Sequence, residues 1–115
     1  MSALFHLYLC GRKAAEWLIF MENIILHVYY RCKSGMAEDF VRAIKDSGVQ
    51  ALVRAEDGCM QYDYHLSLED NDTVVLLEKW RDSEALATHM QQPHMETLKE
   101  FKSRFVQDTA IERYE

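Results

Sequence analysis

Residues that mark linkers and domain boundaries are scarce in this sequence, which has one proline and four glycines among 115 residues. It also lacks internal repeats, low-complexity segments and stretches rich in proline or serine. A chain of this length can bury roughly two-thirds of the surface that it exposes when unfolded, which is enough for one hydrophobic core. We therefore expect one folded domain.

Paired cysteines are missing as well. The three cysteines, Cys10, Cys32 and Cys59, form no CxxC motif. An odd number of scattered cysteines is typical of free thiols in a reducing compartment. The sequence therefore predicts a cytoplasmic protein that needs neither a disulfide nor a metal to fold.

Positive charge is in the minority, with 13 lysines and arginines against 19 acidic residues and a net charge of −6. Nucleic acids and anionic membranes attract basic surfaces, so electrostatics disfavours both as partners. The sequence also lacks a Rossmann glycine fingerprint, a P-loop and a nucleophile elbow. Nucleotide cofactors are therefore not expected.

The first 21 residues are apolar, but they do not match a targeting signal or a membrane span. Positive charge precedes the apolar stretch of a signal peptide, whereas Arg12 and Lys13 follow it here, and with Glu16 they interrupt any span. Met21 then opens a segment that reads like the start of a domain. We interpret residues 1–21 as an N-terminal extension and residues 22–115 as the domain. Alternatively, the extension packs on a partner subunit.

Hydrophobic periodicity predicts the order strand, helix, strand, strand, helix, strand within the domain. The predicted strands cover residues 24–32, 59–68, 73–80 and 105–114. The predicted helices cover residues 36–54, with a bend at Gly48, and the region from Ser83 to Phe105, with a break at Gln92-Pro93. This order is typical of an α+β, ferredoxin-like unit, in which helices cover one face of a four-stranded antiparallel sheet.

The opposite face of the predicted sheet is too apolar to stay in water. It would carry Ile25, Tyr29, Val75 and Leu77. A second copy of the same sheet would cover these side chains. We therefore expect a homodimer that is built through the sheet faces.

Three motifs give the chain a resemblance to the antibiotic biosynthesis monooxygenase (ABM) superfamily. They are Gly58-Cys59-Met60-Gln61-Tyr62-Asp63, then Glu78-Lys79-Trp80-Arg81-Asp82-Ser83-Glu84-Ala85-Leu86, then His89 with Pro93-His94. The resemblance covers roughly residues 22–113 and implies a dimeric α+β barrel of two ferredoxin-like sheets. The activities that it implies are oxidation of phenols and quinols by oxygen without a cofactor, haem degradation, and isomerisation of a phosphorylated signalling sugar.

The residues argue against haem and against a metal. The haem-degrading branch uses an asparagine, a tryptophan and an iron-ligating histidine, and these positions fall here on Val28, His89 and Lys99. His89 and His94 are five residues apart across a proline, whereas a pair of metal ligands on a helix needs a spacing of three or four. We therefore expect no cofactor and no metal site.

The expected function is that of a cofactor-independent monooxygenase of small aromatic, quinol- or phenol-like substrates, with molecular oxygen as the second substrate. Such an enzyme needs a base that works near neutral pH and donors that hold the substrate anion. The resemblance places His89 toward the cavity between sheet and helices, so His89 is the predicted base. The predicted residues around the substrate are Tyr62, as a second catalytic group, with Tyr64, Trp80 and Val28 as binding residues.

Each of these roles has a simpler structural alternative. Tyr62, Tyr64 and Trp80 fit core packing, His89 fits a buried hydrogen bond, and His94 fits the start of a helix. Two other functions also stay open. A phosphosugar isomerase would need cations such as Arg31, Lys33 and Lys79 at its pocket, and the same fold could serve as a non-enzymatic small-molecule binding or stress-response module.

Overall fold

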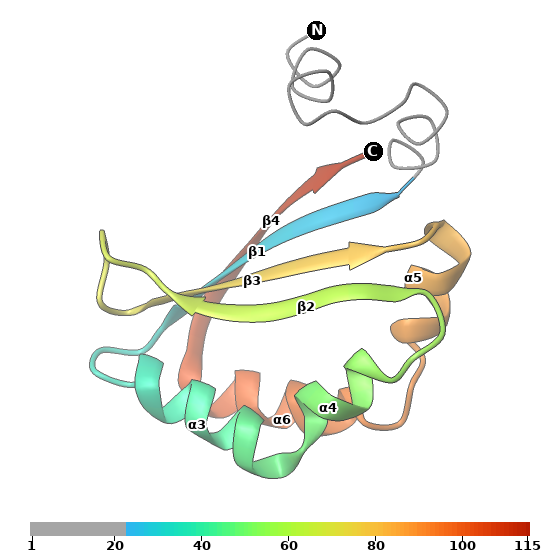
Figure 1. Ribbon diagram of the computed structural model, residues 1–115. Coiled ribbons are helices and arrows are strands. Elements are labelled where there is room, and N and C mark those ends of the chain that lie inside the picture. The colour runs from blue at the N-terminus through green and yellow to red at the C-terminus, as the bar shows by residue number, and fades with distance from the viewer. Residues whose placement is uncertain (1–22) are drawn as a thin grey trace, which may run out of the picture.

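The computed structural model describes residues 23–115, so the predictions about the N-terminal extension lie outside the described residues. Figure 1 shows a sheet whose strands run side by side, with α3, α4 and α6 on one of its faces. In chain order the elements are β1 (Ile24–Cys32), α3 (Ala37–Ser47), α4 (Val49–Arg54), β2 (Cys59–Leu66), β3 (Thr73–Trp80), α5 (Ser83–His89), α6 (Met95–Phe105) and β4 (Val106–Tyr114).

The strands form one antiparallel sheet in the order β2-β3-β1-β4. Helices α3 and α4 connect β1 to β2, helices α5 and α6 connect β3 to β4, and β2 and β3 form a hairpin, so β1 and β3 are the two central strands. This is the ferredoxin-like α+β arrangement that the sequence predicts. None of the helices within residues 23–115 is long and apolar enough to cross a membrane.

Burial alternates along the central strands, as the period of a strand requires. The inward residues of β1, including Ile24, Val28 and Tyr30, are at most 8% exposed, and those of β3 are buried as well. The alternate residues point to the face without helices; Ile25 and Leu77 are half-buried there, and Arg31 is exposed. The core therefore lies between the sheet and the helices.

Two breaks in the helical regions shape the end of the fold that holds the functional residues. Gly48 has φ of +81° and separates α3 from α4, which confirms the predicted bend. The second break separates α5 from α6, because α5 ends at His89 and α6 begins at Met95, beyond the expected interruption at Pro93. The break between α5 and α6 therefore lies between His89 and His94.

Candidate functional site

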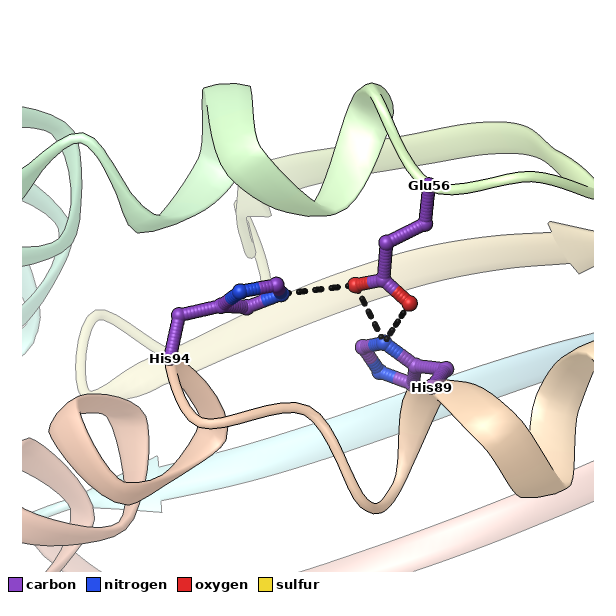
Figure 2. A group of neighbouring side chains, drawn as sticks. All are labelled: Glu56, His89 and His94. Carbon is purple, nitrogen blue, oxygen red and sulfur yellow. Dashed lines mark hydrogen bonds and ion pairs between the residues drawn. The ribbon is translucent and has the colours of Figure 1, made fainter.

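A partly buried carboxylate, Glu56, joins two histidine rings in the structure (Figure 2). Glu56 lies in the turn after α4, where its own N–H donates to the Val53 carbonyl at 3.0 Å and its carbonyl accepts from the Cys59 N–H at 3.1 Å. Its side chain is 9% exposed. The turn thus points an acidic group inward, toward α5 and the start of α6.

The two histidines reach Glu56 from either side of the α5–α6 break. The Nδ1 atom of His89 lies 2.9 Å from Oε2 and 3.1 Å from Oε1 of Glu56, and the Nε2 atom of His94 lies 2.7 Å from Oε2. A carboxylate only accepts hydrogen bonds, so the ring nitrogens that face it are the ones that carry protons. In a neutral ring, a lone pair is then left on Nε2 of His89 and on Nδ1 of His94.

Gly58 and Ala85 hold the Glu56 turn against α5. Gly58 has φ of +87°, and a Cβ atom at this position would lie 2.5 Å from the Cβ atom of Ala85. Only glycine fits such a conformation and such a close approach. The Arg81 N–H also donates to the Gly58 carbonyl at 2.9 Å. Both the glycine and the alanine of the sequence motifs therefore serve to bring Glu56 next to His89.

Aromatic side chains fix the ring of His89, whose side chain is only 1% exposed. Trp80 packs against it with ring centroids 4.4 Å apart and planes tilted by 30°. Tyr62 meets it edge-on at 5.8 Å. The hydroxyl of Tyr64 donates a long hydrogen bond of 3.4 Å to that of Tyr62. The structure thus brings together four of the predicted site residues, His89, Tyr62, Tyr64 and Trp80.

The fifth predicted residue, Val28, lies farther away. It pairs with Leu76 on β3, and Leu76 pairs on its other side with Tyr64 on β2. Val28 is therefore two strands from Tyr64, about 9–10 Å at the usual strand spacing. It is buried in the same hydrophobic core.

A second buried acid, Glu78, lies behind His89. Its Oε1 atom is 3.9 Å from Nε2 of His89 and accepts a hydrogen bond of 2.9 Å from the indole N–H of Trp80. Burial raises the pKa of Glu78, and the Trp80 hydrogen bond and the nearby His89 partly offset this rise. Burial also raises the pKa of Tyr62 well above its ordinary value. Tyr62 is therefore a neutral hydroxyl in this core.

A surface hollow of about 430 Å³ adjoins the Glu56–His94 side of this group. Glu56, Arg81, Thr88, Gln92 and His94 are among the residues that line it. The side chain of His94 is 15% exposed, against 1% for His89. Solvent and small molecules therefore approach the pair of histidines from the side of His94, and His89 lies behind it.

Sequence reasoning missed Glu56 and Glu78 and gave His94 another role. Glu78 carried a readable signal, because it occupies an inward position of β3 between Leu76 and Trp80. Glu56 carried no such signal, because it lies between the predicted helix at 36–54 and the predicted strand at 59–68. His94 does precede α6, but its side chain makes no capping hydrogen bond there and bonds to Glu56.

The cations that a phosphosugar isomerase would need do not gather at this hollow. Arg31 lies on β1 and binds Asp108 on β4 with two nitrogen atoms, the shorter contact being 2.7 Å. Arg81 does line the hollow, but its guanidinium is paired with Asp57 at 3.1 Å and Asp82 at 3.4 Å.

Comparison with known proteins shows relatives in sequence and in fold. The sequence model of the family described as antibiotic biosynthesis monooxygenase matches residues 23–100. The protein named "Putative monooxygenase YcnE" of Bacillus subtilis (strain 168) is 36% identical over 76 residues, which are 64% of this chain and 75% of that protein.

Solved structures agree with the fold. The crystal structure of PA3566 from Pseudomonas aeruginosa is 28% identical, with a TM-score of 0.72 over 82% of this chain and 94% of that one. A conserved protein from Methanosarcina mazei Go1 is 22% identical, with a TM-score of 0.76 over 85% and 96% of the two chains. At this lower identity the likeness concerns the fold alone.

Proposed function

Because the chain belongs to the antibiotic biosynthesis monooxygenase family, and so has a monooxygenase-like function in general terms, we propose that it oxygenates small phenols or quinols. The proposed reaction uses molecular oxygen and no cofactor. One observation carries this proposal, the carboxylate of Glu56 that bridges His89 and His94 beside a hollow of about 430 Å³. A hollow of this volume is within the range of small-molecule sites.

The bridging carboxylate makes the histidines suitable bases. It orients each ring through one N–H and stabilises the positive charge that a ring acquires when its other nitrogen takes a proton. His94 borders the hollow and receives the proton of the substrate hydroxyl. His89, the base predicted from the sequence, shares Glu56 and is held on Trp80, so variants of both histidines are needed to assign the step.

The substrate supplies the electrons in this reaction. Loss of a hydroxyl proton gives an electron-rich anion, which passes one electron to oxygen and leaves a superoxide and a semiquinone radical. These combine into a carbon-bound peroxide, which loses water as a ring C–H bond breaks and a new C–O bond remains. A quinol and oxygen thus give a hydroxyquinone and water, and the substrate has lost four electrons.

The test is oxygen uptake with a panel of hydroquinones and naphthols, with and without the protein. Glu56→Gln and His94→Asn should each lower the rate by about 10²- to 10⁴-fold, the usual contribution of a positioned base. Glu84→Gln is the matched control, because Glu84 also lines the hollow but lies outside the Glu56 bridge. Binding of quinols without oxygen uptake would favour a binding module instead.

The assembly belongs to the same proposal. The sheet face opposite the helices carries Ile25, Tyr29, Val75 and Leu77, all half-buried in the single chain. A second copy of the chain would remove these side chains from water. Light scattering should therefore give twice the subunit mass of 13.5 kDa at micromolar concentration, and a mass of one subunit would reject the dimer.

A further inference from the structure

The Glu56–His89–His94 group has the composition of a transition-metal site. It offers two imidazole nitrogens and one carboxylate oxygen, and the three ligand atoms lie within 4.8 Å of one another. A Zn²⁺ ion bound at about 2.0–2.2 Å from each ligand keeps neighbouring ligand atoms about 3–3.5 Å apart. Glu56 Oε2 already lies 2.9 Å from Nδ1 of His89 and 2.7 Å from Nε2 of His94. Shifts of a few tenths of an ångström at these two pairs, and a closer approach of the two nitrogens, would admit an ion.

The five-residue spacing of the histidines does not exclude such a site. The spacing rule for metal ligands assumes one continuous helix, and the chain between His89 and His94 is not one. The Gln92 N–H donates to the His89 carbonyl at 3.1 Å, and the Met95 N–H donates to the Gln92 carbonyl at 3.0 Å. These tight turns bring both rings to the same side, as Figure 2 shows.

Glu78 supplies the outer partner that a metal-bound histidine requires. If Nδ1 of His89 binds an ion, the ring proton moves to Nε2, and a ligand histidine usually donates this N–H to a carboxylate. Oε1 of Glu78 lies 3.9 Å from Nε2, so a shift of about 1 Å would form this hydrogen bond. Trp80 holds the same carboxylate oxygen at 2.9 Å. The base mechanism gives no role to this buried acid, whereas a metal site does.

We propose that Glu56, His89 and His94 bind one divalent transition-metal ion, such as Zn²⁺ or Co²⁺. Glu56 and His94 open on the hollow, so further coordination positions face water or a small ligand. The proposal rests on the ligand geometry alone and not on the proposed oxygenation. If both hold, the ion replaces the hydrogen bonds to Glu56 and leaves the ring protons on the nitrogens that the base mechanism uses, so the metal-bound form is the inhibited one.

The test titrates the full-length protein, freed of metal by a chelator, with Co²⁺ and follows the visible spectrum, then displaces Co²⁺ with Zn²⁺. We expect one ion per subunit with nitrogen and oxygen ligands. Glu78→Gln should weaken binding by about 10–100-fold, the usual effect of losing an outer partner, and Glu56→Gln and His94→Asn should weaken it further.

Matched control variants distinguish Co²⁺ binding at this site from Co²⁺ binding by other acidic residues and histidines of the chain. Glu84→Gln, His65→Asn and His6→Asn should bind Co²⁺ with the affinity of the unchanged protein, and His94→Asn should keep its unfolding midpoint in the absence of metal within a few degrees. Absence of saturable binding, or binding that survives both Glu56→Gln and His94→Asn, would overturn the proposal. Oxygen uptake in the chelated protein tests the proposed function separately, because it requires no ion.

Discussion

The core of this protein has two halves of different chemistry. In one half, Phe40, Ile44 and Val74 are fully buried and form an apolar cluster. The other half carries a polar cluster that reaches from the core to the surface hollow, which we define as Glu56, Glu78, His89 and His94. The side chains of Glu78 and His89 are 8% and 1% exposed.

The two clusters differ in how their burial affects the stability of the fold. Apolar burial stabilises a domain roughly in proportion to the area removed from water. Burial of ionisable groups opposes folding unless their hydrogen bonds and charges are satisfied. In this chain the Glu56 carboxylate bonds to the histidines, and the Trp80 indole donates a hydrogen bond to Glu78. Such an arrangement is expected where chemistry, rather than stability, sets the choice of residues.

The largest effect should come from the apolar cluster. Phe40 is 0% exposed and packs edge-on against Tyr30 with ring centroids 5.3 Å apart. Phe40→Ala should lower the free energy of unfolding by about 3–5 kcal/mol, measured by denaturant unfolding. Phe40→Leu is the matched control and should lower the free energy of unfolding by a smaller amount. Equal, small losses in both variants would mean that this half of the core is not tightly packed.

Gly58→Ala tests the contact that joins the turn of Glu56 to α5. An alanine at this position would have to adopt the left-handed backbone conformation of Gly58, and its Cβ atom would lie 2.5 Å from the Cβ atom of Ala85. The left-handed backbone alone costs about 1–3 kcal/mol for a residue other than glycine, and the contact adds to it. Gly35→Ala is a suitable control, because Gly35 has φ of +75° with nothing within 4 Å of an added Cβ atom. Similar losses in both would show that the Ala85 contact contributes nothing.

His89→Ala should lower both stability and activity, because His89 is a core residue as well as a partner of Glu56. It removes the Glu56 hydrogen bond of 2.9 Å and the packing on Trp80. A buried acceptor that loses its partner costs about 1–3 kcal/mol, although His94 remains bonded to Glu56. Thermal unfolding and oxygen uptake should be measured on the same sample. Unchanged uptake with lowered stability would assign His89 to the scaffold and leave His94 as the base.

The fold could be predicted from the sequence because its signals are local. Alternation along β1 and β3, the turn between β2 and β3, and Gly48 and Pro93 each act within a few residues. Their order allows few topologies, and the ferredoxin-like arrangement is one of them. β2 alone ended early, at Leu66 instead of Leu68, where the Ser67 hydroxyl accepts hydrogen bonds from the Glu69 and Asp70 N–H groups.

The site could be predicted only in part, because its partners come from three separate segments. The aromatic residues around His89 share one face of two neighbouring strands, and this pattern is visible in the sequence. The bridge from Glu56 to His94 spans 38 residues and depends on the turn geometry at Gly58 and on the α5–α6 break. Spacing rules for a continuous helix could not anticipate it.

The smallest effect concerns Glu78 and the pH dependence of stability. Burial raises the pKa of this carboxyl above its ordinary value of about 4.5, so the folded chain holds the proton more tightly than the unfolded chain does. The stability that this group contributes is therefore fully present below the unfolded pKa, and it is lost as the pH rises through the folded pKa. Each unit by which the pKa of Glu78 is raised lowers the free energy of unfolding by about 1.4 kcal/mol at a pH where Glu78 is ionised in both the folded and the unfolded chain.

Glu78→Gln removes this loss, because an amide does not ionise and can still accept the hydrogen bond from Trp80. Near neutral pH the variant should unfold at the same or a higher denaturant concentration than the unchanged protein, and the difference should shrink as the pH falls toward about 4.5. Denaturant midpoints across this pH range measure it. Glu100→Gln, at an exposed position of α6, controls for the change in net charge. If Glu78→Gln were less stable near neutral pH, the attraction of His89 and the Trp80 bond would outweigh desolvation, and the polar cluster would stabilise the fold instead of opposing it.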